Sequence, residues 1–258
     1  MTGVQTCALP ILWLLKSSFQ SPKDLFTKIP VLSFDSYHLQ NYLTVIKDPS
    51  ILHALRNSLI VAGGSTLIST IVGILSAYAF TRLRFRGRNA LFVGVLLTQM
   101  LPGIVLVIPL YMIMRQLGLL TSYAGLLLSY VCFTLPYSIW LQRAYMTNAP
   151  WELEDQARVD GCGRIEALVR VILPTIAPGL VTATIFAFVN AWNEYLFALV
   201  LSNPETKTIP VRLSEYISQE RIALELMFPA SVIATIPILI LIAFFGRYII
   251  SGLTSGAL

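Results

Sequence analysis

Acidic side chains and one glycine gather in a single charged stretch, PWELEDQARVDG, over residues 150–161. Pro150 can occupy the first turn of a helix, because the N–H that proline lacks has no partner there. Carboxylates that follow it lie at the positive end of the helix dipole. Gly161 predicts a chain reversal, since glycine readily adopts the positive φ that ends a helix. The acidic members of the stretch are Glu152, Glu154, Asp155 and Asp160.

A second, amphipathic helix is expected after this turn. Glu166 and Arg170 form an i, i+4 pair on its wetter side. In the helix before the turn, Leu153 and Ala157 share one face, also at i, i+4. The apolar positions of the second helix follow i, i+3, i+4 and i+7, and they are Ile165, Leu168, Val169 and Ile172.

Asn193 and Glu194 are a separate candidate, because they lie inside an apolar run over residues 176–201. An ionisable group at membrane depth is costly, so Glu194 either lies near an interface or faces a translocation pathway. An outer belt of aromatic residues with a solvated carboxylate is the first alternative, and a pathway residue is the second.

The sequence has no motif typical of catalysis. It lacks a G-x-x-x-x-G-K-[ST] phosphate loop, a nucleophile elbow and H-E-x-x-H. Its three cysteines form no C-x-x-C pair, and its two histidines fit no metal spacing. We therefore predict no catalytic residue, no cofactor site and no metal site, and we expect that the chain is not an enzyme.

The elements that must position these residues are membrane helices. Hydrophobic residues make up 56% of the chain, and several runs exceed the roughly 18 apolar residues that a spanning helix needs. The net charge of +5 is carried by loops beside these runs, as expected for residues that set topology and meet lipid headgroups. No interleaving of basic and aromatic residues indicates a nucleic-acid partner. The sequence predicts an all-α, polytopic membrane protein in contact with the lipid bilayer.

A dense group of arginines fixes the predicted orientation. The stretch TRLRFRGRN, residues 81–89, is assigned to the cytoplasm by the positive-inside rule. Pro102 and Pro109 interrupt the next span. Polar segments over 20–53, where no helical period persists, and over 203–227 are assigned to the other side. The predicted spans are 54–80, 90–115, 123–145, 176–201 and 229–250, with residues 12–19 as the stub of a first span.

The first eleven residues, MTGVQTCALPI, are expected to lie outside the natural protein. They look like the translation of a sequencing-library adapter, and the alternative is a genuine apolar segment that leads into Lys16. We predict an artefact over residues 1–11 and a single transmembrane domain over residues 12–258.

The run E-L-E-D-Q-A-R-V-D-G, followed by I-L-P-T-I-A-P, resembles the "EAA" loop of binding-protein-dependent ABC importer permeases. The core of that loop reads E-A-A, then three residues, then G. Asp155, Gln156, Ala157 and Gly161 fall on those positions; Asp155 is one methylene shorter than glutamate, and Gln156 replaces an alanine. The alternative is an amphipathic helix that lies on the membrane surface.

The resemblance implies a type I ABC importer transmembrane domain with about six spanning helices, the first of them truncated. It also implies a multi-pass protein of a bacterial or archaeal cytoplasmic membrane. The cytoplasmic loop 147–175 would then be a coupling helix that docks on a separate ATPase subunit, which hydrolyses ATP. A second permease subunit and an extracytoplasmic solute-binding protein are implied as further partners. The implied docking residues are Glu152, Leu153, Glu154, Asp155, Ala157, Asp160 and Gly161.

Two further stretches resemble the carbohydrate-uptake branch of these permeases, similar to the maltose-type second permease subunit. They are A-W-N-E-Y-L-F-A, which contains Asn193 and Glu194, and T-I-P-V-R-L at residues 208–213. A sugar or oligosaccharide is the implied substrate, and Asn193 and Glu194 are candidates for the translocation pathway. The alternatives are a permease for another small solute, a membrane scaffold, or an ion-coupled secondary transporter, which would need buried ionisable residues near the midplane.

Overall fold

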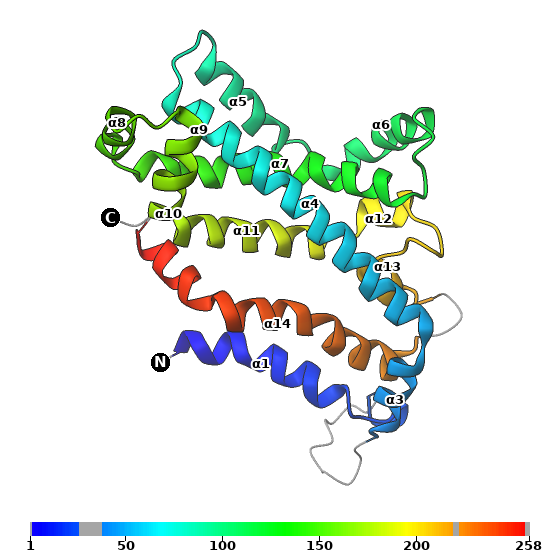
Figure 1. The fold of residues 1–258 in the computed structure, drawn as a ribbon. Coiled ribbons are helices and arrows are strands. Elements are labelled where there is room, and N and C mark those ends of the chain that lie inside the picture. Colours follow the sequence, from blue (N-terminus) through cyan, green and yellow to red (C-terminus); the bar gives the residue numbers. More distant parts are fainter. Residues whose placement is uncertain (1, 26–37, 219–221, 256–258) are drawn as a thin grey trace. The chain divides into compact units, whose positions relative to one another are not determined.

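The computed structural model describes residues 2–25, 38–218 and 222–255, and its regular elements are helices (Figure 1). Within these residues the only β-type contact is an isolated antiparallel bridge between Ile217 and Ile222. Three described helices are long and apolar enough to cross a membrane, or up to five if each of two bent helix pairs is one span. The all-α, polytopic prediction is confirmed. The three long helices are α4 (Pro49–Arg82), α7 (Tyr123–Asn148) and α14 (Leu224–Ser255).

The chain divides into two compact units. The first comprises residues 1–58 and 202–240, and the second comprises residues 59–201 and 241–258. Helices α4 and α14 each contribute to both units. The single domain over 12–258 stays a prediction, as does the artefact over residues 1–11, of which residues 2–11 form the first part of α1 (Thr2–Ser17).

The first unit contains short helices where the sequence predicted none. These are α2 (Pro22–Leu25) and α3 (Gln40–Lys47), both inside the polar segment 20–53. Each is too short to show a sustained apolar period, which explains why periodicity missed them. In α3 only Val45 is buried. Residues 26–37 of this segment lie outside the described part of the chain.

Polar side chains of α4 hold the segment after residue 202 in the first unit. The Asn57 amide donates to the carbonyl oxygens of Glu205 and Lys207, at 2.9 Å each. The Ser58 hydroxyl accepts the N–H of Ile209 at 2.7 Å. Asn57 and Ser58 are buried, so these bonds satisfy groups that have little access to water. They set the start of α13 (Ile209–Ser214) against the α4 end of this unit.

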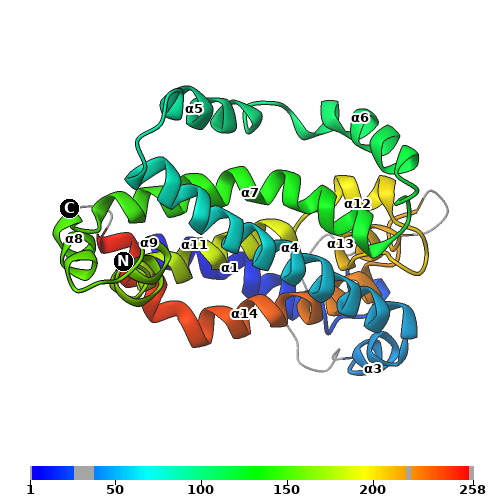
Figure 2. The same ribbon diagram turned by 45° about the horizontal axis from the view of Figure 1, so that its top comes forward.

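The second unit is built around α7, which packs against α11 (Ala177–Trp192) along its length (Figure 2). Helix α5 (Arg88–Thr98) also packs on α7. Helix α12 (Leu196–Leu201) packs on both α7 and α6 (Gly103–Gln116). Buried hydroxyls link helices as well, since Ser69 and Thr134 share a hydrogen bond of 2.6 Å between α4 and α7.

The predicted span 90–115 is interrupted at the first of its two prolines. It forms α5 and α6, whose axes differ by 98° across a short break. Pro102 ends the break because it lacks an N–H and disfavours helical geometry at the residue before it. Pro109, which the prediction treated alike, lies inside α6 and does not end it. The Gln99 side chain in the break donates to the Phe133 carbonyl of α7 at 3.1 Å.

The predicted span 176–201 is also interrupted. Helix α11 ends at Trp192, and α12 begins at Leu196. Asn193 and Glu194 therefore lie in a turn between two helices and not inside one. At its other end α11 is bent by 86° from the preceding helical segment, Arg164–Thr175.

Candidate functional site

The charged loop forms the two helical segments that the sequence predicts. Helix α8 (Trp151–Val159) starts directly after Pro150. Gly161 has φ +93°, the left-handed conformation expected of a glycine that ends a helix. The N–H of Cys162 bonds to the carbonyl of Ala157 at 3.0 Å, which closes this C-terminal turn. After the turn, α9 (Arg164–Ala167), the π-helix η2 (Leu168–Ile172) and α10 (Leu173–Thr175) form one continuous helical segment.

A buried polar network ties α8 to the last turn of α4. Tyr78 donates its hydroxyl to Glu154 at 2.6 Å, and the Arg82 Nε lies 3.5 Å from the other oxygen of that carboxylate. Arg82 also donates to the Ala149 carbonyl at 2.7 Å, and its guanidinium lies 4.2 Å from the centre of the Trp151 ring. Glu154 and Arg82 are only 6% and 7% exposed. Helix α8 is therefore anchored to α4 by charge as well as by packing.

Two of the predicted docking residues lie on the inner face of α8. The side chains of Glu154 and Ala157 are buried within this chain. They are three positions apart in the helix, so they lie on the same face of α8. That face is turned toward α4 and η2. A contact of these two residues with the ATPase stays a prediction.

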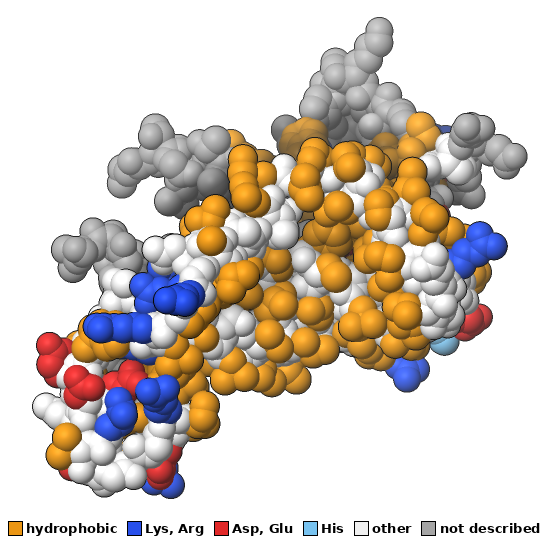
Figure 3. Space-filling view, turned by 90° about the horizontal axis from the view of Figure 1, so that it is seen from above, with side chains coloured by type: hydrophobic (Ala, Val, Ile, Leu, Met, Phe, Trp, Pro, Cys, Tyr) orange, Lys and Arg blue, Asp and Glu red, His pale blue; other side chains and the backbone are white. Residues whose placement is uncertain are grey.

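The opposite face of α8 is open. Glu152, Asp155 and Asp160 are exposed, as is Gly161, and Leu153 is half-buried. Val159, which the sequence analysis did not single out, is 87% exposed. At the α8 end of the second unit, Figure 3 shows acidic and basic side chains close together beside a largely hydrophobic surface. The exposed surface thus combines carboxylates with an unpartnered apolar side chain.

The second helical segment departs from the predicted apolar face. Leu168 and Ile172 are buried in a core cluster with Tyr78 and Met146, whereas Ile165 is 61% exposed. Ile165 and Val169 are four residues apart and both exposed, as Leu168 and Ile172 are four apart and both buried, so the buried face is centred away from Ile165. A π-helical turn, which holds more residues per turn than an α-helix, follows at residues 168–172.

Pro174 accounts for the wide turn. Its nitrogen cannot donate to the carbonyl of Arg170, and its ring would clash with that carbonyl in an α-helix. The i→i−5 bond from the N–H of Leu173 to the carbonyl of Leu168 replaces the regular pattern just before it. Val169 is exposed, next to the predicted Glu166–Arg170 ion pair, which is present at 2.6 Å.

The structure places Asn193 and Glu194 apart from this loop, at the opposite end of α11. The Glu194 carboxylate accepts the N–H groups of Phe197 at 3.0 Å and Ala198 at 3.2 Å, and so caps α12. Tyr130 of α7 donates its hydroxyl to the Glu194 carbonyl at 3.3 Å. Asn193 is exposed, and its amide donates to Val189 at 2.9 Å. The role of both residues in translocation stays a prediction, but Glu194 has a structural task.

The sequence analysis missed Tyr78 and Arg82 as partners of the charged loop, although their spacing weakly indicates a shared role. Tyr78 and Arg82 are spaced i, i+4 in the last turn of an apolar run, which places them on one helix face. Arg82 was counted with the other arginines of the loop as a topology determinant. A tyrosine and an arginine on one helix face can bind a carboxylate together. Which carboxylate meets them depends on the fold and cannot be read from their spacing.

Comparison with known proteins agrees with this architecture. Residues 69–255 match the family described as "Binding-protein-dependent transport system inner membrane component". The chain is 36% identical over 257 residues to the trehalose/maltose transport system permease protein MalG of Thermococcus litoralis, covering 98% of this chain and 91% of that protein. It is 35% identical over 249 residues to the diacetylchitobiose uptake system permease protein DasC of Streptomyces coelicolor, covering 96% and 90%.

A solved structure shows the same fold. A chain of a bacterial ABC transporter involved in the import of the acidic polysaccharide alginate aligns with a TM-score of 0.78 and 24% identity, over 95% of this chain and 92% of that chain. The family match covers most of this chain, including both helical segments of the charged loop. The chain therefore belongs to the inner membrane components of binding-protein-dependent transport systems.

Proposed function

We propose that this chain is a membrane-spanning permease subunit of an ATP-driven ABC importer, and that its solute is a sugar or oligosaccharide. The two relatives described above are named for the transport of trehalose, maltose and diacetylchitobiose, all of them saccharides. They align with nearly the whole chain, so the proposal concerns the complete transmembrane subunit. An extracytoplasmic solute-binding protein would deliver the sugar, and a second permease subunit would complete the pathway.

The observation that carries the proposal is the geometry of α8 and the turn that follows it. Glu152, Asp155 and Asp160 are exposed beside Val159, on a helix whose other face is fixed to α4. We infer that this open face docks in a groove of a separate ATPase subunit that hydrolyses the ATP. Basic side chains in the groove would pair with the carboxylates, and an apolar floor would receive Val159.

Movement of the docked α8 would reach the spanning helices through two connections. The first is the Glu154 network with Tyr78 and Arg82 of α4. The second is the core cluster, in which Leu168 and Ile172 pack with residues of α4, α7 and α11. Because both connections are buried, α8 and the ends of these helices would move together when the ATPase subunits close, and the transmembrane pathway would open to the other side.

Co-purification tests this proposal. The chain is expressed with the ATPase and permease genes cloned beside it, and Gly161→Arg is compared with Gly118→Arg. Gly161 and Gly118 both have positive φ, +93° and +68°, with nothing within 4 Å of an added Cβ, so the backbone strain is matched. Gly161→Asn is a further control because asparagine tolerates this conformation.

The expected result is that the ATPase is lost with Gly161→Arg and retained with Gly118→Arg and Gly161→Asn. Retention of the ATPase with every variant would rule out docking at this turn. Sugar specificity is measured separately, as ATP-dependent uptake of labelled maltose, trehalose and diacetylchitobiose by proteoliposomes of the assembled complex. Uptake of an amino acid in place of any saccharide would contradict the substrate assignment and leave the docking assignment intact.

A further inference from the structure

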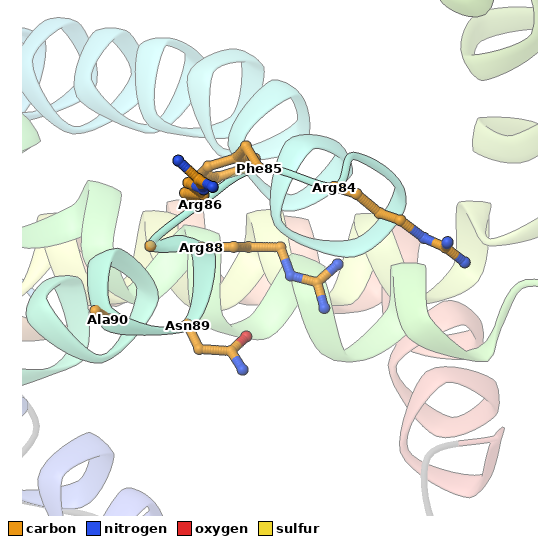
Figure 4. Close-up of a pocket in the computed structure, with 7 residues that line it drawn as sticks. Arg84, Phe85, Arg86, Arg88, Asn89 and Ala90 are labelled. Atoms are coloured by element: carbon orange, nitrogen blue, oxygen red, sulfur yellow. The ribbon is translucent and has the colours of Figure 1, made fainter.

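The connection between α4 and α5 presents an unusual group of cations. Arg84, Arg86 and Arg88 lie within five residues of one another on this connection. Figure 4 shows the Arg84 and Arg88 side chains extending to the same side, while Arg86 points away from them. Arg84 and Arg86 are exposed, and Arg88 is half-buried. Three positive charges this close repel one another, so an anion nearby would stabilise the arrangement.

Among the residues that the structure describes, no carboxylate forms an ion pair with the group. The sequence contains no Asp or Glu between Asp48 and Glu152. Among the described residues, the ion pairs of the second unit are Arg82–Glu154 and Arg170–Glu166, and neither includes the three arginines. Glu154, which could supply a negative charge, already forms an ion pair with Arg82. The group therefore faces its surroundings as uncompensated charge.

The connection is held in a defined shape. The Phe80 ring of α4 lies 6.2 Å from the Phe85 ring and 5.6 Å from the Phe92 ring of α5, so an aromatic cluster joins both helices to the connection. Arg88 donates to the Leu83 carbonyl at 3.3 Å. Gly87 takes φ +81° at the start of α5, where no side chain caps the helix. The surface of this connection has an open hollow of about 620 Å³. Its lining residues are Arg84, Phe85, Arg86, Gly87, Arg88, Asn89 and Ala90.

An apolar surface continues from the hollow. Helix α5 begins at Arg88 and exposes Leu91, Val93 and Leu97, each more than half exposed. Phe85 on the connection is 41% exposed. A cationic hollow that opens onto exposed apolar side chains matches a molecule with an anionic head and a hydrocarbon tail.

We propose that this hollow binds the headgroup of an anionic phospholipid, with its phosphodiester on Arg84 and Arg88 and an acyl chain along α5. Guanidinium groups bind phosphate oxygens in a bidentate way, which suits a phosphodiester. Arg84 lies two residues after Arg82, which contacts α8, so the hollow lies at the same membrane surface as α8. Anionic lipids are abundant in the cytoplasmic leaflet.

Lipid titration followed by native mass spectrometry tests the proposal on the full chain purified in detergent. The probes are phosphatidylglycerol and phosphatidylcholine with identical acyl chains. The triple variant Arg84→Gln, Arg86→Gln, Arg88→Gln is compared with a control triple, Lys47→Gln, Arg56→Gln, Arg115→Gln. The control residues are exposed cations in none of the described ion pairs, and both triples remove three charges.

We expect the original chain to prefer phosphatidylglycerol. Each basic residue near an anionic surface contributes about fivefold in affinity, so the Arg84/86/88 triple should weaken phosphatidylglycerol binding roughly 100-fold. The control triple should leave it unchanged. Equal affinity for both lipids, or equal loss in both triples, would overturn the proposal.

Two further arms separate lipid from other anions. Soluble glycerol phosphate that displaces the lipid at a similar concentration would show an adventitious ion site in place of a lipid site.

The triple variant is also mixed with the ATPase subunit. Loss of ATPase binding with unchanged phosphatidylglycerol binding would show that the arginines belong to a protein interface, which would likewise overturn the proposal.

Discussion

At the scale of single residues, the buried contacts of Glu154 hold α8 against α4. Its carboxylate is buried and meets a hydroxyl and a guanidinium that come from the end of α4. A buried ion pair costs desolvation energy, but removing one partner costs more because the other charge is left unpaired.

We predict that Glu154→Ala or Arg82→Ala destabilises the chain by about 3–5 kcal/mol. Replacing both residues, as Glu154→Leu with Arg82→Met, should recover most of this loss. Thermal unfolding of the purified chain in detergent measures the effect. The matched control is Asp155→Ala, since Asp155 is exposed on the same helix and should change stability little. A loss with Glu154→Ala no larger than with Asp155→Ala would contradict the assignment.

Asp48 provides a pH-dependent prediction in the first unit. Burial raises the pKa of this carboxyl, but hydrogen bonds from Ser50 and the Arg212 guanidinium at 3.0 Å outweigh it and hold the pKa below 3.8. Because the folded-state pKa is lowered, its stabilising contribution is present above the unfolded pKa and is lost as the pH falls through the folded value. The melting temperature of the original chain should therefore fall more steeply below about pH 4 than that of Asp48→Asn. Parallel acid dependence in the two proteins would exclude this contribution.

At the scale of helices, α7 and α11 approach each other closely at one glycine. Gly179 of α11 lies against the ring of Tyr145, and an added Cβ would collide with it. Small residues at such positions allow spanning helices to pack closely.

Gly179→Ala should therefore destabilise the chain by roughly 1–3 kcal/mol through overpacking. Tyr145→Leu in the same chain should relieve part of the loss by removing the ring. Gly94→Ala in α5 is the control, because nothing lies within 4 Å of an added Cβ there. Chemical or thermal unfolding of the original chain, of Gly179→Ala, of Tyr145→Leu and of the double variant measures this coupling, and additive effects of the two substitutions would argue against a direct contact.

At the scale of the whole molecule, the docking proposal predicts that the turn after α8 becomes protected on assembly. Cys162 is half-buried one residue after Gly161. In a chain with Cys7→Ser and Cys132→Ser, maleimide labelling of Cys162 should slow when the ATPase subunit is bound.

Gln116→Cys in a chain without the three native cysteines is the control for this labelling. Gln116 is exposed at the end of α6, and its labelling should not depend on the ATPase. Unchanged labelling of Cys162 in a complex that demonstrably contains the ATPase would place the docking site elsewhere.

The features that local chemistry determines were predictable from the sequence. Apolar runs predicted α4, α7 and α14, and glycine after an acidic helix predicted the turn at Gly161, because both depend on neighbouring residues alone. The spacing of carboxylate, glycine and proline also identified the family. Proline was less reliable, since Pro102 separates two helices while Pro109 lies inside one, although the rule for both residues is the same.

The direction of each functional side chain was decided by the tertiary structure. Glu154 faces inward because Tyr78, 76 residues away in the chain, supplies a hydroxyl at the right point. Ile165 is exposed because its segment packs through Leu168 and Ile172, and Glu194 caps α12 because the predicted span breaks after Trp192. Hydropathy and turn propensity act over one or two helical turns, so they place helices and their ends. Which face is covered depends on contacts between segments far apart in the sequence, and those exist only in the folded chain.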